Sequence, residues 1–176
     1  MRSGDSMTLD FVTVAYGPDL PLLRLQARSL ALYLDRDACG AILVIGNDPR
    51  NRFLAAQFRE TVLPAYGPLA PAVRYVDAAE VSDFSGIARA GQGWRRQQGL
   101  KLDVHRLVRT RGYVTLDCKN HLTRPTRADA FADGKGRLRV APRGVKPEHM
   151  SGSATSASRR PIGRSQYSRS RRPSPW

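Results

Sequence analysis

Short apolar runs alternate with helix-like stretches along the first 125 residues, and this alternation restricts the fold more than any other feature. The runs fit strands at residues 9–15, 41–46, 73–76 and 113–116. The run at 41–46, AILVIG, has no polar face, which is typical of a strand covered by helices on both sides. This order predicts an α/β fold with a Rossmann-like, mostly parallel sheet.

Three stretches between these runs have helical spacing, at 19–34, at about 50–63 and from 93 onwards, with a loop at about 82–92. The apolar faces expected for them contain Leu22, Leu23, Leu25, Leu30, Leu32 and Leu34 in the first, Phe53, Leu54, Phe58 and Val62 in the second, and Leu100, Val104, Leu107 and Val108 in the third. We expect each face to pack on the sheet.

Polar groups follow the apolar runs, and in a parallel sheet the carboxyl ends of the strands share one edge. Asp48 and Asp77 each precede an expected helix, which favours a role in capping it. Asp117 has no helix directly after it and stands beside Lys119, Asn120 and His121. The segment that follows strand 113–116 is therefore the strongest candidate for a functional site.

The helix that begins near residue 93 has a second, polar-tipped stripe formed by Trp94, Gln98, Lys101 and His105. Trp94 is either a partly buried anchor or part of a site. Lys101 is either a solvated side chain or, like Gln98, part of a site. For His105 the simpler interpretation is a solvated side chain.

The net charge of +14 is concentrated in the last third of the chain. Residues 1–125 hold 17 Lys and Arg against 12 Asp and Glu, whereas residues 126–176 hold 12 against 3. We expect a hairpin at 130–140, a disordered leader at residues 1–7 and disorder in the Ser/Arg-rich tail at 151–176, which is too poor in apolar residues to fold. The tail is a polyanion-binding segment, a solvated segment without a role, or an out-of-frame product of a GC-rich gene, which we favour.

Cysteine usage and hydropathy bear on the compartment. Cys39 and Cys118 form no disulfide framework, which fits a reducing environment. No run approaches the roughly 18 apolar residues of a membrane helix, and the N-terminus lacks a signal pattern. A soluble, cytoplasmic protein is expected.

Three segments carry a family resemblance: TVAYGPD at 13–19, GWRRQQGLKL at 93–102 and TLDCKNH at 115–121. Over residues 8–150 the chain resembles a bacterial group of glycosyltransferase-like proteins with the A-type glycosyltransferase fold. The resemblance implies a nucleotide-sugar site that contains Thr13, Tyr16, Asp48, Gln97, Gln98, Lys101, Asp117, Lys119, Asn120 and His121.

A-type enzymes hold a divalent metal with an Asp-any-Asp motif, and the corresponding residues are Asp117, Cys118 and Lys119. The resemblance thus implies Mn²⁺ or Mg²⁺ at Asp117, helped by Asn120 or His121. With lysine in the second position, direct neutralisation of the phosphates is the alternative, and the metal becomes optional. Lys119 is equally well explained as a solvated residue or as the salt-bridge partner of Asp117.

Two functions follow. The first is a glycosyltransferase-like protein that binds a nucleotide sugar for transfer to a glycan or small acceptor. A complete enzyme of this type needs a further segment for the acceptor and the catalytic base, so we expect a truncated chain with impaired activity and name no catalytic residue. The alternative is a non-catalytic protein whose basic tail binds nucleic acid or another polyanion.

Overall fold

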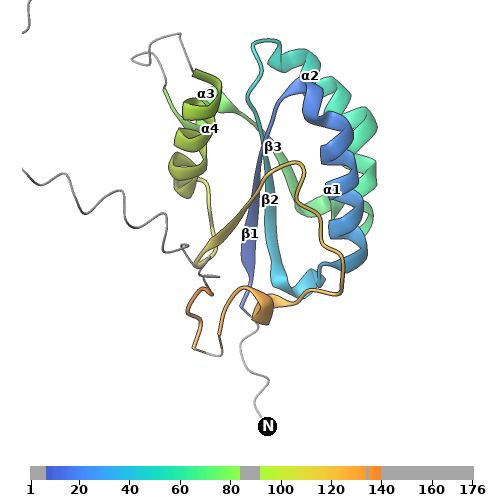
Figure 1. Ribbon diagram of the computed structural model, residues 1–176, viewed down its shortest axis with the longest axis vertical. Helices are drawn as coiled ribbons and strands as arrows, with labels where there is room; N and C mark the ends of the chain where they lie inside the picture. The colour runs from blue at the N-terminus through green and yellow to red at the C-terminus, as the bar shows by residue number, and fades with distance from the viewer. Residues whose placement is uncertain (1–6, 84–91, 134, 140–176) are drawn as a thin grey trace, which may run out of the picture. The chain divides into compact units, whose positions relative to one another are not determined.

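The structure is a computed structural model that describes residues 7–83, 92–133 and 135–139, all within a unit that spans Met1–Val140. Its centre is one four-stranded parallel sheet with the order β3-β2-β1-β4 (Figure 1). The strands are β1 (Leu9–Ala15), β2 (Cys39–Gly46), β3 (Val73–Asp77) and β4 (Tyr113–Leu116). The predicted α/β class and the Rossmann-like parallel sheet are confirmed.

Helical segments cover both faces of the sheet, as Figure 1 shows. One face packs against α1 (Leu20–Tyr33), the π-helix η3 (Phe58–Val62) and the 3-10 segment η4 (Leu63–Ala72), with α2 (Asn51–Gln57) leading into them. The other face packs against α3 (Ala78–Val81) and α4 (Gln92–Asp103). Shorter 3-10 turns are η1 (Gly17–Asp19), η2 (Arg36–Ala38), η5 (Val104–Arg106) and η6 (Ala128–Ala130).

The central strand β1 is buried along its whole length, and its side chains alternate between the two cores. Phe11 and Ala15 face the α1 side, whereas Val12 and Val14 face the α4 side. This two-residue period follows from the pleat of the strand. Five of its seven residues are apolar, as a strand buried on both faces requires, and the two polar residues, Asp10 and Thr13, are buried as well.

Helix α1 occupies the predicted range, but part of its predicted apolar face is wrong. Leu22, Leu25 and Leu32 are 41%, 50% and 74% exposed. Leu23, Leu30 and Leu34 are buried as predicted, and the other inward positions belong to Ala27 and to the polar residues Gln26 and Ser29. A helix offers only one stripe to a sheet, so six leucines spread around its circumference cannot all reach the core.

Two other helices also depart in part from the expected pattern. Leu54, Phe58 and Val62 are buried as predicted, whereas Phe53 is 60% exposed. On the α4 side Leu100 and Val104 are buried and Leu107 packs against them, as predicted; Val108 lies outside that cluster. The α-helix stops at Asp103 and continues as the 3-10 turn η5, which turns Val108 away from the stripe.

One buried carboxylate joins the start of the sheet. Asp10, 1% exposed, accepts backbone N–H groups from Ala41 at 2.8 Å and from Arg109 at 2.9 Å. Its own N–H donates to Thr110 Oγ1. Asp10 thus fixes where β2 and the segment before β4 lie against β1. A Cβ at Gly40 would lie 2.5 Å from Asp10 Oδ1, so no side chain fits at Gly40.

The remaining expectations concern the N-terminal leader, the loop, the hairpin and the tail. Met7, expected to belong to a disordered leader, packs against the core instead. The structure does not describe residues 1–6, the loop residues 84–91 or the tail at 151–176. The predicted hairpin is present as one antiparallel bridge between Ala132 and Leu138, with Gly134 outside the described set. Across the described ranges, no helix has the length and apolar character that a membrane span requires.

Candidate functional site

The strand order places a topological switch point between β1 and β4. The chain moves from β1 through β2 to β3 in one direction and then returns to the opposite side of β1 to form β4. In open parallel sheets the carboxyl ends of the two strands at such a point border a ligand-binding crevice.

Two adjoining hollows lie at this edge of the sheet. The first, which we call the β2-side hollow, has a volume of about 420 Å³ and is lined by Val14, Ala15, Tyr16, Asp19, Asn47, Pro49, Gly93, Arg96 and Gln97. The second, the β4-side hollow, has a volume of about 270 Å³ and is lined by Val14, Asp19, Leu22, Gln97, Gln98, Lys101, Asp117, Cys118 and Lys119. They share Val14, Asp19 and Gln97, so they form one continuous site.

A short ion pair stands in the β4-side hollow. Lys101 Nζ, in the last turn of α4, lies 2.6 Å from Asp117 Oδ1, directly after β4. The Lys101 side chain is 16% exposed and that of Asp117 is 39% exposed. The Tyr113 hydroxyl donates to the Lys101 carbonyl, which also ties α4 to β4. The pair is therefore held by its elements rather than by two mobile side chains.

The turn that carries Asp117 is fixed from beneath by Gln26. This fully buried side chain donates through Nε2 to the carbonyls of Asp117 at 2.6 Å and of Asn120 at 3.1 Å, and it accepts from Thr13 Oγ1 at 2.9 Å. The Asn120 amide oxygen closes the turn by accepting the Asp117 N–H at 2.7 Å. Asp117 is thus presented on a turn whose backbone polar groups are satisfied.

Six of the ten residues expected to contact a ligand line the two hollows: Tyr16, Gln97, Gln98, Lys101, Asp117 and Lys119. Tyr16 is 46% exposed, and Lys119 is exposed on the rim. The structure therefore brings together residues from β1, α4 and the β4 turn.

The other four expected residues do not line these hollows. Thr13 is buried and its hydroxyl is used by Gln26, and the Asn120 side chain is used within its own turn. His121 is exposed, with Nε2 3.5 Å from the Leu22 carbonyl oxygen. Asp48 has a side chain that is only 4% exposed, and it accepts the N–H of Gly17 at 3.1 Å.

The strand-end aspartates have different roles. Asp77 caps α3 through a capping box with Glu80, which confirms its predicted role. The predicted capping by Asp48 is wrong, because the N-cap position of α2 is Arg50. Asp48 instead joins the turn after β1 to the turn after β2, since its two oxygens accept the N–H groups of Gly17 and Arg50.

The partner of Asp117 is another correction. The sequence offered Lys119 as a salt-bridge partner, but the structure pairs Asp117 with Lys101. The chain leaves the strand in a turn at residues 118 and 119 and Lys119 is exposed there, whereas α4 brings Lys101 to the end of β4. His105, as expected, is exposed, with Nδ1 near the Leu102 carbonyl; the side chain of Trp94 lies outside the described part of the chain.

Asp19, which the sequence predicts only as the start of the first helix, lies at the candidate site. It occupies the N-cap position of α1, but its side chain makes no capping hydrogen bond. It lines both hollows instead. Its position two residues after Gly17, in a turn that leaves β1, is the one signal that pointed to a location at the strand-end edge. Arg96 was likewise missed and lines the β2-side hollow.

The pKa of the Cys118 thiol is raised by burial and by the charges around the β4-side hollow. Burial, together with the nearby carboxylates of Asp19 and Asp117, raises the pKa of its thiol to about 12, and Lys101 partly opposes this shift. The thiol lies 3.6 Å from the Val14 carbonyl oxygen. The raised pKa favours the protonated thiol, and Cys118 packs as a small apolar group.

The residues present do not fit a divalent metal at Asp117. Among the residues that the structure describes, no three His, Cys, Asp or Glu side chains gather in a way that would hold an ion. Asp117 Oδ1 already contacts an ammonium group, and Asn120 and His121 point elsewhere. A divalent ion at Asp117 would have to displace this ammonium and would take most of its oxygen ligands from water or from the phosphates of a ligand.

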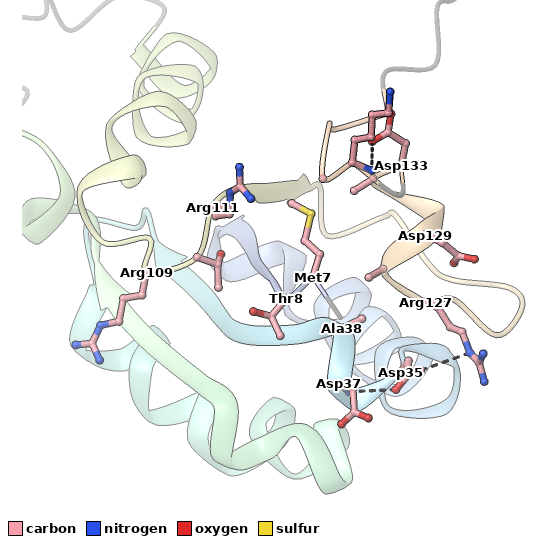
Figure 2. Close-up of a pocket in the computed structure, with 15 residues that line it drawn as sticks. Met7, Thr8, Asp35, Asp37, Ala38, Arg109, Arg111, Arg127, Asp129 and Asp133 are labelled. Atoms are coloured by element: carbon pink, nitrogen blue, oxygen red, sulfur yellow. Dashed lines mark hydrogen bonds and ion pairs between the residues drawn. The ribbon is translucent and has the colours of Figure 1, made fainter. Parts of the chain in front are cut away.

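A larger hollow of about 930 Å³ lies at the opposite, amino-terminal edge of the sheet (Figure 2). Met7 and Thr8 line it just before β1, and Arg109 and Arg111 just before β4. Figure 2 shows charged side chains of both signs around its border, including the Asp35–Arg127 ion pair at 3.5 Å. Its place at the amino ends of the strands sets it apart from the switch point, where ligands of such folds bind.

The fold and this edge define a Rossmann-like α/β protein with a site at its switch point. The chain belongs to the family described as "Family of unknown function (DUF6492)", whose model matches residues 15–167. The matched range begins at the last residue of β1 and covers β2, β3, β4, the residues of both hollows other than Val14, and the first part of the Ser/Arg-rich tail. No curated protein and no solved structure matches the chain.

Proposed function

We propose that the switch-point site binds a nucleotide sugar and that the protein is glycosyltransferase-like, acting on a glycan or small acceptor. The observation that supports this most is the continuity of the two hollows at the carboxyl ends of β1 and β4. The volume of the β2-side hollow lies within the usual range of small-molecule sites.

The residues that line the two hollows include groups suited to each part of a nucleotide sugar. Lys101, Lys119 and Arg96 supply positive charge for phosphate groups. Asp19 and Gln97 offer oxygen and amide groups to hydroxyls of a ribose or a sugar. In this proposal, Tyr16 at the open side of the β2-side hollow stacks against the base.

A ligand that binds only the folded state must raise its stability, by about 2.7 kcal/mol at a concentration 100 times the Kd. We therefore expect at least one of UDP-glucose, GDP-mannose and ADP-glucose to raise the Tm of the full chain. Asp19→Asn should reduce this shift, whereas Asp129→Asn should not, because Asp129 is exposed at the opposite edge of the sheet. No shift with any nucleotide sugar would contradict the proposal.

The basic tail supports a second candidate, a non-catalytic protein that binds nucleic acid or another polyanion. Residues 126–176 carry nine net positive charges, and six arginines without any acid lie after residue 150. Binding of this kind weakens steeply with salt. Fluorescence anisotropy with a labelled DNA duplex should then show salt-sensitive binding by the full chain that a variant ending at residue 150 loses, while nucleotide-sugar binding remains.

A cytoplasmic location is part of the first proposal, because nucleotide sugars are used there and the chain carries two free thiols, Cys39 and Cys118. Fractionation of cells that produce the protein, with the protein followed by an antibody, tests the location directly.

A further inference from the structure

We infer that this site binds the diphosphate of its ligand without a divalent metal ion, and that Lys101 replaces the ion beside Asp117. The inference rests on the proposed nucleotide-sugar function and concerns the chemistry of the same site. It departs from the Mn²⁺ or Mg²⁺ that the resemblance to A-type enzymes implies.

The position of the Lys101 ammonium carries the argument. It lies 2.6 Å from Asp117 Oδ1, the Lys101 side chain is 16% exposed, and both residues line the β4-side hollow. A dication bound to the same oxygen would stand next to this ammonium, and two positive charges a few ångströms apart repel strongly in a partly buried site. Metal binding would first require Lys101 to leave.

The ammonium is also suited to replace the metal on the ligand side. A lysine has three N–H donors, and Asp117 uses one of them. The remaining two are available to phosphate oxygens in the hollow. The carboxylate thus holds the ammonium in place, and the ammonium neutralises the diphosphate.

Lys119 supplies a second cation, at the position where the A-type enzymes that the chain resembles have the second aspartate of their motif. It is exposed on the rim of the β4-side hollow, and its side chain forms no hydrogen bond or ion pair with any residue that the structure describes. Only two carboxylates, those of Asp19 and Asp117, line this hollow, and two lysines balance them. The added negative charge of a diphosphate therefore meets cations instead of a metal cluster.

The test compares nucleotide binding with and without metal, using isothermal titration of the full chain with UDP, GDP and ADP. We expect the Kd of the nucleotide that binds to agree within about twofold between buffer with EDTA and buffer with millimolar Mn²⁺. In the EDTA buffer Lys101→Met should weaken binding about 10-fold or more, as loss of a charge-assisted hydrogen bond does. Lys135→Met, on the hairpin at the other edge, is the matched control and should change nothing.

Titration with Mn²⁺ alone, followed by electron paramagnetic resonance, gives a readout independent of nucleotide. Wild-type protein should show no saturable Mn²⁺ site. Lys101→Met frees the Asp117 carboxylate, so this variant should gain Mn²⁺ affinity and recover part of its nucleotide affinity when Mn²⁺ is present. Lys119→Met, an exposed substitution that leaves the fold intact, should weaken nucleotide binding at least threefold.

Each opposite result refutes a different statement. Nucleotide binding by wild-type protein that requires Mn²⁺ would leave the proposed function standing and overturn the metal-free inference. Unchanged nucleotide affinity in Lys101→Met, with the circular dichroism spectrum of wild type, would show that the Lys101–Asp117 pair is only a structural salt bridge. Absence of nucleotide binding in both buffers would overturn the proposed function and this inference together.

Discussion

Replacing Gln26 by methionine should destabilise the protein and loosen the site at the same time. Gln26 is fully buried and makes three hydrogen bonds, to the carbonyls of Asp117 and Asn120 and from the Thr13 hydroxyl. Methionine has a similar volume, so the core keeps its packing. The substitution removes one hydrogen bond from each of two carbonyl oxygens and from one hydroxyl, while the Asp117 carbonyl keeps the N–H of Asn120.

The size of the effect follows from these three groups. A net loss of about 1 kcal/mol for each buried hydrogen bond gives a decrease of about 3 kcal/mol in the free energy of unfolding. A domain of this size has about 5–15 kcal/mol in total. With an m-value of about 2 kcal/mol/M, the urea midpoint should fall by about 1.5 M.

Urea titration followed by circular dichroism measures this difference, and two variants calibrate it. Gln57→Met is the matched control, because Gln57 is half-buried and its side chain makes no hydrogen bond within the described residues. Thr13→Val removes one of the three bonds and should decrease the free energy of unfolding by about 1 kcal/mol. The reasoning fails if Gln26→Met changes the free energy of unfolding by less than about 1 kcal/mol, or by no more than Gln57→Met.

The remaining predictions concern the α3 cap, a glycine of β2 and the two thiols. Asp77→Ala removes a capping box and should lower the free energy of unfolding by about 1–2 kcal/mol in urea titrations; an unchanged midpoint would contradict the capping role. Gly46→Ala places a Cβ on the Tyr75 hydroxyl and should destabilise by about 1–3 kcal/mol; Tyr75→Phe should relieve part of that loss. Burial raises the pKa of Cys39 to about 11 and that of Cys118 to about 12, above the ordinary 9.0. As the pH rises from about 9 to 12, the unfolded chain therefore loses these protons before the folded chain does, and the free energy of unfolding should fall. Cys118→Ala should flatten that fall, and identical slopes for both proteins would refute the assignment.

The candidate site could be predicted in outline but not in its contacts. Asp117 could be predicted because an apolar run that ends in polar groups marks a strand end, and parallel strands end at one edge; Lys101 and Gln97 followed from the family resemblance. Gln26 carried no comparable signal. A glutamine within a leucine-rich helix looks like a solvated residue, and only its contact with a turn 91 residues further along the chain makes it buried and structural.

The sequence by itself determined the four strands and the ranges of α1 and of the α2–η3 helix, because hydrophobic period and β-propensity act over a few neighbouring residues, and their alternation predicted a mostly parallel sheet. Tertiary structure alone decided which stripe of α1 faces the sheet, so that Leu32 is exposed and Gln26 is buried. It also decided that Asp117 meets Lys101 rather than Lys119, since that pair depends on where α4 crosses the end of β4. Local patterns determine the secondary structure of each segment, whereas ion pairs and buried hydrogen bonds form between segments that are far apart in the sequence and close in space.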